Sequence, residues 1–213
     1  QRDLVLSAGW DREILAHSFS RRTLLGRVPG HKSPVVALQV CGGTLVSADD
    51  DGRIGFCALD SLDTVTTQAG HSGSVNALVA SAGHALSAGD DGFVNVWSVT
   101  ERKRLHRVQV STTAVRALAS SPDHRYAAVA CADGGLRVLS LESGEVCAGW
   151  LLGSGATTCD WSGPEIVCGT RAGEVLSFDF LPPRLLVAAS WHPERLFLAA
   201  LHGDGVLSVG EWH

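Results

Sequence analysis

The chain has 213 residues, of which 45% are hydrophobic and only 18% are charged, with a formal net charge of −5. This length suits one domain that is large enough to bury a core, and the mild acidity argues against a general affinity for nucleic acid backbones. The 24 glycines and the scarcity of charge favour many short strands joined by tight turns, and no apolar run reaches the length of a membrane span.

A turn signal recurs along the chain. It stands at Asp11-Arg12, Asp51-Gly52, Asp91-Gly92, Asp133-Gly134, Ala172-Gly173 and Asp204-Gly205, with spacings of 40, 40, 42, 39 and 32 residues. An apolar run precedes each turn and a shorter alternating run follows it. Such pairs of runs predict antiparallel hairpins, and no segment has a helical period of apolar residues over three turns. The pattern therefore predicts an all-β fold of repeated four-stranded units.

The third unit has the most specific pattern. From Gly70 it reads GHSGSVNALVASAGHALSAGDDGFVNVWSV. The Gly-His pair, the Asp-Asp-Gly turn and the run that ends at Trp97 resemble the WD-repeat family, with Ser98 where the family has Asp. The resemblance implies a β-propeller, with about five and a half four-stranded blades visible in this sequence as part of a seven-bladed ring.

We expect one propeller region over residues 1–213. The expected blades are approximately 1–29 (partial), 30–69, 70–109, 110–150, 151–188 and 189–213 (partial). The first unit opens on a second-strand pattern, and the sequence Leu-Pro-Pro-Arg at 181–184 interrupts the fifth, because Pro is poorly tolerated inside a sheet. The absence of Met and the start at Gln1 favour a fragment of a larger multidomain protein. A shorter ring, in which the first and last strands share a blade, is the alternative.

In the resembled family, one His, one Ser or Thr, one Asp and one Trp of a blade form a hydrogen-bonded tetrad. The matching positions here are His71, Ser87, Asp91 and Trp97, with partial sets at His31, Ser47 and Asp51 and at Ser7 and Asp11. Ser, His and Asp are also the residue types of a hydrolase triad. A triad would occur once, whereas these residues repeat, which favours groups that satisfy one another inside a blade. We therefore expect no enzymatic activity.

The acidic and cysteine residues give no metal-ligand pattern. Asp49, Asp50 and Asp51 lack the spacing of a calcium loop, and the six cysteines contain no C-x-x-C pair. We expect no metal, no cofactor and no small-molecule substrate. Cysteines inside apolar strands favour reduced thiols, and no signal peptide opens the chain, so we expect an intracellular protein, cytoplasmic rather than nuclear.

The dense basic run at 101–107 has two interpretations: an outermost strand whose charges guard an exposed edge, which we favour, or a patch for phosphate or an acidic partner.

In the resembled family the ligand face carries the residues just before each turn Asp and those at the start of each first strand. Carried over by position, these are Trp10, Lys32, Asp50, Ser74, Asp90, Arg116 and Arg171. An exposed Trp beside charges is a typical interface anchor, although Trp10 could instead pack against a neighbouring blade. We expect a scaffold that binds a protein or peptide partner without membrane insertion. The alternatives are an RNA-contacting component of a ribonucleoprotein and a regulatory module of a nucleotide-binding or membrane-trafficking protein.

Overall fold

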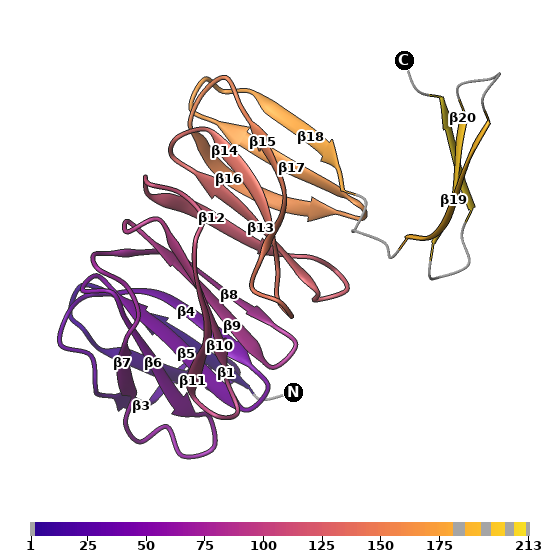
Figure 1. The fold of residues 1–213 in the computed structure, drawn as a ribbon. Coiled ribbons are helices and arrows are strands. Elements are labelled where there is room, and N and C mark those ends of the chain that lie inside the picture. Colours follow the sequence, from indigo (N-terminus) through magenta and orange to yellow (C-terminus); the bar gives the residue numbers. More distant parts are fainter. Residues whose placement is uncertain (1–2, 181–185, 193–196, 203–206, 212–213) are drawn as a thin grey trace. The chain divides into compact units, whose positions relative to one another are not determined.

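The structure is a computed structural model that describes residues 3–180, 186–192, 197–202 and 207–211, with side chains described up to residue 180. The chain divides into two compact units, residues 1–179 and 180–213, each of which is described by itself. All regular elements in these residues are β-strands (Figure 1). The expected interruption at 181–184 lies outside the described residues.

The first unit contains five antiparallel sheets in chain order. The first sheet consists of β1 (Leu4–Ala8), β2 (Ile14–Ser18) and β3 (Thr23–Val28). The second consists of β4 (Val35–Cys41), β5 (Thr44–Asp49), β6 (Arg53–Ala58) and β7 (Thr66–Ala69). The third consists of β8 (Val75–Ser81), β9 (His84–Gly89), β10 (Phe93–Ser98) and β11 (Lys103–Gln109). The fourth consists of β12 (Val115–Ser120), β13 (Tyr126–Cys131), β14 (Gly135–Ser140) and β15 (Val146–Leu151). The fifth consists of β16 (Ala156–Ser162), β17 (Glu165–Thr170) and β18 (Val175–Asp179).

The second unit forms one more sheet, made of β19 (Leu186–His192), β20 (Phe197–His202) and β21 (Leu207–Glu211). The expected all-β propeller architecture is confirmed, since each described sheet is an antiparallel meander of three or four strands. No helix among the described residues is long and apolar enough to cross a membrane.

The recurrent Asp-Gly signal closes the tight turn between the second and third strands of a sheet. At Gly52 and Gly92 the backbone has φ values of +81° and +75°, which favour glycine. A Cβ atom there would lie 2.4 and 2.3 Å from the carbonyl oxygens of His71 and Ser111. Glycine is therefore required at both turns for its backbone conformation and for the close approach of the following sheet segment.

The hydrophobic core lies between successive sheets. The first strands β4, β8, β12 and β16 contact one another in sequence, so they form a continuous row through the unit. One cluster joins the second and third sheets and includes Phe56 and Trp97, whose ring centroids lie 6.0 Å apart. A sheet that lies between two neighbouring sheets buries both of its faces. The strand β9 of the third sheet is accordingly buried at all but one of its residues. The blades are thus held together by apolar packing across their faces.

Candidate functional site

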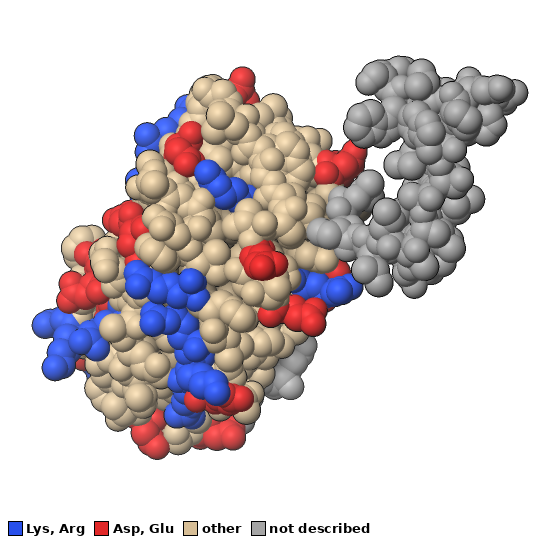
Figure 2. All heavy atoms as spheres, in the orientation of Figure 1, with Lys and Arg blue, Asp and Glu red and all other residues tan. Residues whose placement is uncertain are grey.

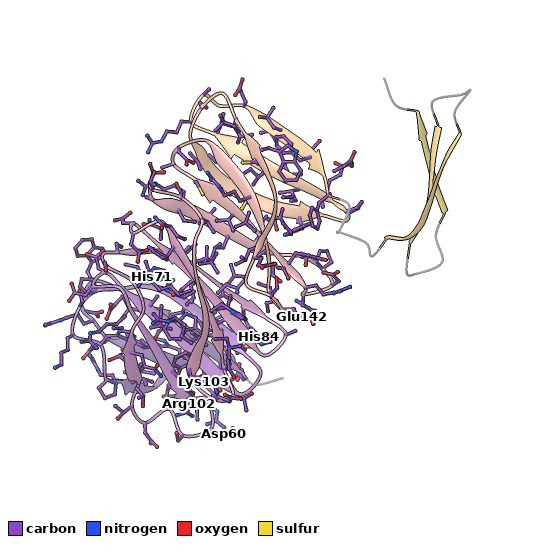
Figure 3. All side chains as sticks on the ribbon, viewed as in Figure 1. Asp60, His71, His84, Arg102, Lys103 and Glu142 are labelled. Atoms are coloured by element: carbon purple, nitrogen blue, oxygen red, sulfur yellow. The ribbon has the colours of Figure 1, made fainter. Side chains whose placement is uncertain are left out.

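The third sheet contains a chain of buried hydrogen bonds. Trp97 donates from Nε1 to Ser87 Oγ at 2.9 Å, and Ser87 Oγ lies 2.8 Å from His71 Nε2. His71 Nδ1 lies 2.9 Å from Asp91 Oδ1. His71 stands at the end of the sheets opposite the turns that carry Asp60 and Arg102, next to which β11 begins at Lys103 (Figure 3). The structure thus brings all four residues of the expected tetrad into one network.

The protonation of this network follows from its donors and acceptors. Burial lowers the pKa of His71 below its ordinary value of 6.5, and the hydrogen bond with Asp91, which raises the pKa, does not compensate. Burial also raises the pKa of Asp91, but hydrogen bonds from His71 and from the Ser72 amide outweigh it and lower the pKa below 3.8. A neutral imidazole donates from Nδ1 to the carboxylate and accepts at Nε2 from the Ser87 hydroxyl.

A fifth residue, Asn95, joins the network and was missed in the sequence. Its Nδ2 donates to the carbonyl oxygen of Gly70 at 3.0 Å and lies 2.9 Å from His71 Nε2. Asn95 is completely buried in β10. A polar residue in an otherwise apolar alternating strand was the available signal, because a buried amide requires partners.

The second sheet has a related network, but the assignment of Asp51 to it was wrong. His31 Nε2 lies 2.7 Å from Ser47 Oγ, whereas His31 Nδ1 lies 2.8 Å from Oδ2 of Asp49. Asp49 is 0% exposed and also accepts a hydrogen bond from the Arg53 amide. Asp51 is exposed to solvent.

The difference comes from the residue that ends the second strand of each sheet. In the third sheet this is Gly89, and a Cβ atom there would lie 3.1 Å from the His71 ring, so the carboxylate must come from Asp91. In the second sheet the same position is Asp49, whose side chain projects to the imidazole itself. Asp49 ends β5, whereas Asp51 lies in the turn that follows. Because Asp51 matches Asp91 by the period of 40 residues, that period alone could not identify Asp49 as the partner.

The assignment of Ser7 and Asp11 to a partial tetrad was also wrong for the described residues. Ser7 is exposed, and the Asp11 carboxylate accepts a hydrogen bond from the Glu13 amide at 3.2 Å within its own turn. The physical reason is that, in the described residues, the first sheet begins at β1, so no described strand with a histidine covers these positions as in the second and third sheets.

The fourth sheet replaces the tetrad by an ionic arrangement. Ser111 takes the place of the histidine and donates to Asp133 Oδ2 at 2.9 Å. Arg137 donates to the same oxygen at 3.3 Å from the position that Asn95 occupies in the third sheet. These contacts brace the fourth blade without an imidazole.

The turns that follow β1, β5, β9, β13 and β17 lie at one end of the first unit, which we call the turn face. Backbone hydrogen bonds tie these turns to the start of the sheet's first strand. Asp50 donates to the Pro34 carbonyl at 2.9 Å, Asp90 to Ser74 at 3.1 Å and Arg171 to Gly155 at 2.9 Å. Ala132 makes the same bond to the Ala114 carbonyl at 2.9 Å, so the link fixes the turn residue in four sheets. It leaves the side chains of Asp50, Asp90 and Arg171 exposed.

Trp10 occupies the same turn position in the first sheet. Its side chain is 87% exposed. The turn is closed by a hydrogen bond from the Arg12 amide to the Gly9 carbonyl at 3.1 Å, and Arg12 has a φ of 68°. Within the described residues, the ring is therefore presented to solvent on a tight turn.

The structure brings two other candidate side chains together. Arg116 NH1 lies 3.6 Å from Asp90 Oδ1, and Asn76 donates to the same oxygen at 2.8 Å. Asn76 also donates to the Val115 carbonyl at 3.0 Å, which links the third and fourth sheets. Asn76 was not singled out in the sequence, although it stands one residue after the start of β8, as Arg116 does in β12.

The remaining candidates lie on the same face without such a cluster. Lys32 is exposed beside the buried His31, and Ser74 takes part through its backbone carbonyl. Among the residues whose side chains are described, no group of three or more His, Cys, Asp or Glu residues is arranged to hold a metal ion.

The basic run forms the outer strand β11, along which Lys and Arg side chains gather in Figure 2. Two of its arginines pack on the blade itself. The guanidinium of Arg104 lies 5.9 Å from the Trp97 ring centroid, and that of Arg107 lies 4.0 Å from the Phe93 ring centroid. Arg107 also donates to Asp91 at 3.4 Å. These contacts favour the interpretation as a charged edge strand.

Comparison with known proteins agrees with this geometry. The family described as "WD domain, G-beta repeat" matches residues 62–98 and 102–140. The crystal structure of the computationally designed Ika8 protein is similar to this chain with a TM-score of 0.78 and 21% sequence identity, over 100% of this chain and 69% of the designed one. At this identity the likeness concerns the fold.

Proposed function

We propose that this chain, which belongs to the WD-repeat β-propeller family, is a non-catalytic scaffold that binds a protein or peptide partner through the turn face, within a larger multidomain protein. The observation that carries the proposal is Trp10, whose side chain is 87% exposed on a tight turn. Tryptophan is usually largely buried, and exposed Trp residues are enriched among the residues that dominate binding energy at interfaces. Charged neighbours on the same face supply the polar rim that such interfaces have.

The buried tetrad supports binding rather than chemistry. Ser87 has the residue type of a nucleophile, but it is 0% exposed and accepts a hydrogen bond from Trp97. A substrate carbonyl would need to reach within about 3 Å of that oxygen. The Ser-His-Asp set therefore serves as a brace inside the blade.

Contact with RNA has less support. Two arginines are already paired with carboxylates of the chain. Arg116 of β12 pairs with Asp90, and Arg107 of the outer strand β11 pairs with Asp91. An RNA-binding face would present unpaired cations in a contiguous patch. The proposed setting is intracellular, which is supported by six cysteines that are all free thiols.

The test compares four forms of the chain as affinity baits in cells: the unchanged chain, Trp10→Ala, Asp90→Lys and Phe19→Ala. Phe19 is a matched control, because it is an aromatic residue of the same sheet, is 75% exposed and lies on the β2–β3 turn at the opposite end. We expect one or more partners to fall by about tenfold for Trp10→Ala and Asp90→Lys and to remain with Phe19→Ala, while the melting temperature is unchanged.

Two results would overturn the proposal: partners that are insensitive to Trp10→Ala, or partners that are lost equally with Phe19→Ala. Retention of RNA that falls steeply with salt, with no protein partner lost, would favour the RNA alternative instead.

A further inference from the structure

A hollow of about 400 Å³ lies between the third and fourth sheets. Its walls come from the start of β9, from β11, from the β12–β13 turn and from the β14–β15 turn, all at the end of the sheets opposite the turn face. Both sheets have four strands, so the hollow lies between two complete units of the repeat. Its volume is at the small end of the range for ligand pockets, which suits one or two side chains of a partner.

Three histidines from separate segments line the hollow. His84 begins β9, His106 lies in β11 and His124 lies in the β12–β13 turn. Arg125 adds a guanidinium, and Glu142 is the one carboxylate among the described residues that line the hollow. Figure 3 labels His84 and Glu142, which come from the third and fourth sheets. Imidazole and guanidinium groups donate hydrogen bonds, so this set of side chains favours an anionic group.

The backbone and a contact with the third sheet hold His124 in place. Its φ is 58°, a conformation that is unfavourable for a residue with a Cβ atom. The His124 amide donates to the Ser121 carbonyl at 2.9 Å, and its Nδ1 lies 3.3 Å from Ser81 Oγ. The ring of His124 is therefore positioned where the two sheets meet.

The His106 ring lies against the β14–β15 turn. A Cβ atom at Gly144 would lie 2.8 Å from His106 Nδ1, and Gly144 has a φ of 72°. Glycine at this turn thus leaves room for an imidazole of the neighbouring sheet. Two of the three histidines consequently contact the sheet that faces their own.

Apolar side chains form the rest of the wall. Leu141 and Tyr126 are buried, whereas Leu105 on β11 is 39% exposed. The Arg125 guanidinium lies 5.9 Å from the Tyr126 ring centroid. A ligand that carries an apolar side chain beside its anionic group therefore matches both parts of the hollow.

The strand that borders the hollow is basic. Exposed Lys103, Arg104 and Arg107 lie on β11 (Figure 2). Because Arg104 and Arg107 pack on aromatic rings of their own sheet, they contribute a positive field rather than direct contacts in the hollow. Such a field attracts an acidic partner over several ångströms.

We propose that this hollow binds an acidic peptide segment of a partner protein. One carboxylate of the segment lies among His84, His106, His124 and Arg125, and a neighbouring apolar side chain packs against Leu105. The N–H groups of the imidazoles and the guanidinium supply the hydrogen bonds. This site lies at the end opposite the turn face, so the proposal stands independently of the function proposed above.

The probe for this site is a phage-displayed library of random dodecapeptides, selected on the purified chain. We expect the selected peptides to be enriched in Asp or Glu next to a large apolar residue. A fluorescent synthetic copy of one selected peptide should bind one per chain by anisotropy, and a copy with Asn or Gln in place of its acids should bind at least about tenfold more weakly. Trp10→Ala should leave this binding unchanged, which separates the site from the turn face.

Two matched pairs of substitutions locate the peptide. His84 lines the hollow and His17 does not, and both are half-buried. Arg125 lines it and Arg102 does not, and both are exposed. His84→Gln and Arg125→Gln should each weaken the peptide by about tenfold, because a donor to the carboxylate is lost. His17→Gln and Arg102→Gln should change binding by less than about twofold.

A change of opposite sign is expected for Glu142. Glu142→Gln removes a charge that repels the carboxylate of the peptide, so it should strengthen binding by about twofold to fivefold. A side chain with a merely structural role would not have this effect. Glu165→Gln is the control, because Glu165 is exposed in the fifth sheet and outside the hollow.

Several results would overturn the proposal: selected peptides without an excess of acids, binding that survives both His84→Gln and Arg125→Gln, or weaker binding after Glu142→Gln. Equal effects within either matched pair would overturn it as well. A complex that forms only with added Zn²⁺ would also do so, because the imidazoles would then serve a metal ion.

Discussion

Nδ1 of His31 lies 2.8 Å from Oδ2 of Asp49, with both side chains inside the second blade. Nδ1 of His71 makes the equivalent contact with Asp91, which stands two residues further along its repeat. Two blades of one protein therefore reach the same brace from different positions, since a carboxylate at either site can lie against the ring. The contact, rather than the position, is what the two blades share.

We expect Asp49→Ala to lower the free energy of unfolding by about 2–4 kcal/mol, because it leaves a buried histidine without its charged acceptor. Asp51→Ala removes an exposed side chain and should change the free energy by less than about 0.5 kcal/mol. Urea unfolding of the two variants measures both values. Equal losses would contradict the assignment of Asp49.

Glycine at position 55 makes room for the second network. A Cβ atom there would lie 2.2 Å from Val65 Cγ1, 2.6 Å from Ser47 Oγ and 2.8 Å from His31 Nε2. Gly55→Ala should therefore destabilise the chain by about 1–3 kcal/mol through overpacking.

Gly43→Ala is the matched control for that substitution, because a Cβ atom at Gly43 meets nothing within 4 Å. It should leave the thermal midpoint nearly unchanged. If Gly55→Ala and Gly43→Ala have the same thermal midpoint, the close packing around His31 does not exclude a side chain at position 55.

The protonation of His71 predicts a dependence of stability on pH. The pKa of His71 in the folded chain lies below 6.5, so His71 is protonated more readily in the unfolded chain than in the folded chain. Stability from this residue is present above about pH 6.5 and decreases as pH falls from there towards the lower folded pKa. The lowered pKa of Asp91 acts only below 3.8, outside this window.

His71→Gln isolates this effect from the other histidines. The loss of stability that it causes should be smaller at about pH 5 than at about pH 7.5, because the unchanged chain has by then lost part of its advantage. Chemical unfolding at the two pH values measures the difference. A gap that stays constant or widens at low pH would contradict a neutral, buried His71.

The buried thiols should be inert in the folded chain. Burial raises the pKa of Cys131 to about 11 and that of Cys159 to about 12. Since the thiolate is the reactive form, alkylation of both residues by iodoacetamide at about pH 8 should be at least about 100-fold slower than in the unfolded chain. Mass spectrometry of the alkylated peptides gives the two rates, and similar rates would show that these thiols are accessible.

The repeat of about 40 residues predicted the hairpins and the all-β architecture well, because the turn chemistry and strand alternation are local properties. The network of the third sheet also followed from its motif. Contacts that depend on which side chain faces a ring did not, as Asp49 and Asn95 show. A polar residue in an apolar run indicates that a buried partner is needed, but it does not identify that partner.

The edge of β1 marks another limit of the sequence. Ser7 and Asp11 match the repeat in identity, but a tetrad needs the strand that brings a histidine over them. Position within a repeat thus predicts where a residue lies and not whether its partner is present. The exposure of Trp10 likewise became clear only from the turn on which it stands.

Photo-crosslinking in cells can show whether partners bind through the turn face. A benzophenone amino acid replaces Trp10 in one form of the chain and Phe19 in a second, two exposed aromatic positions at opposite ends of one sheet. We expect a discrete covalent adduct with a partner from position 10 and none from position 19. An adduct from position 19 alone, or from neither position, would contradict binding through the turn face.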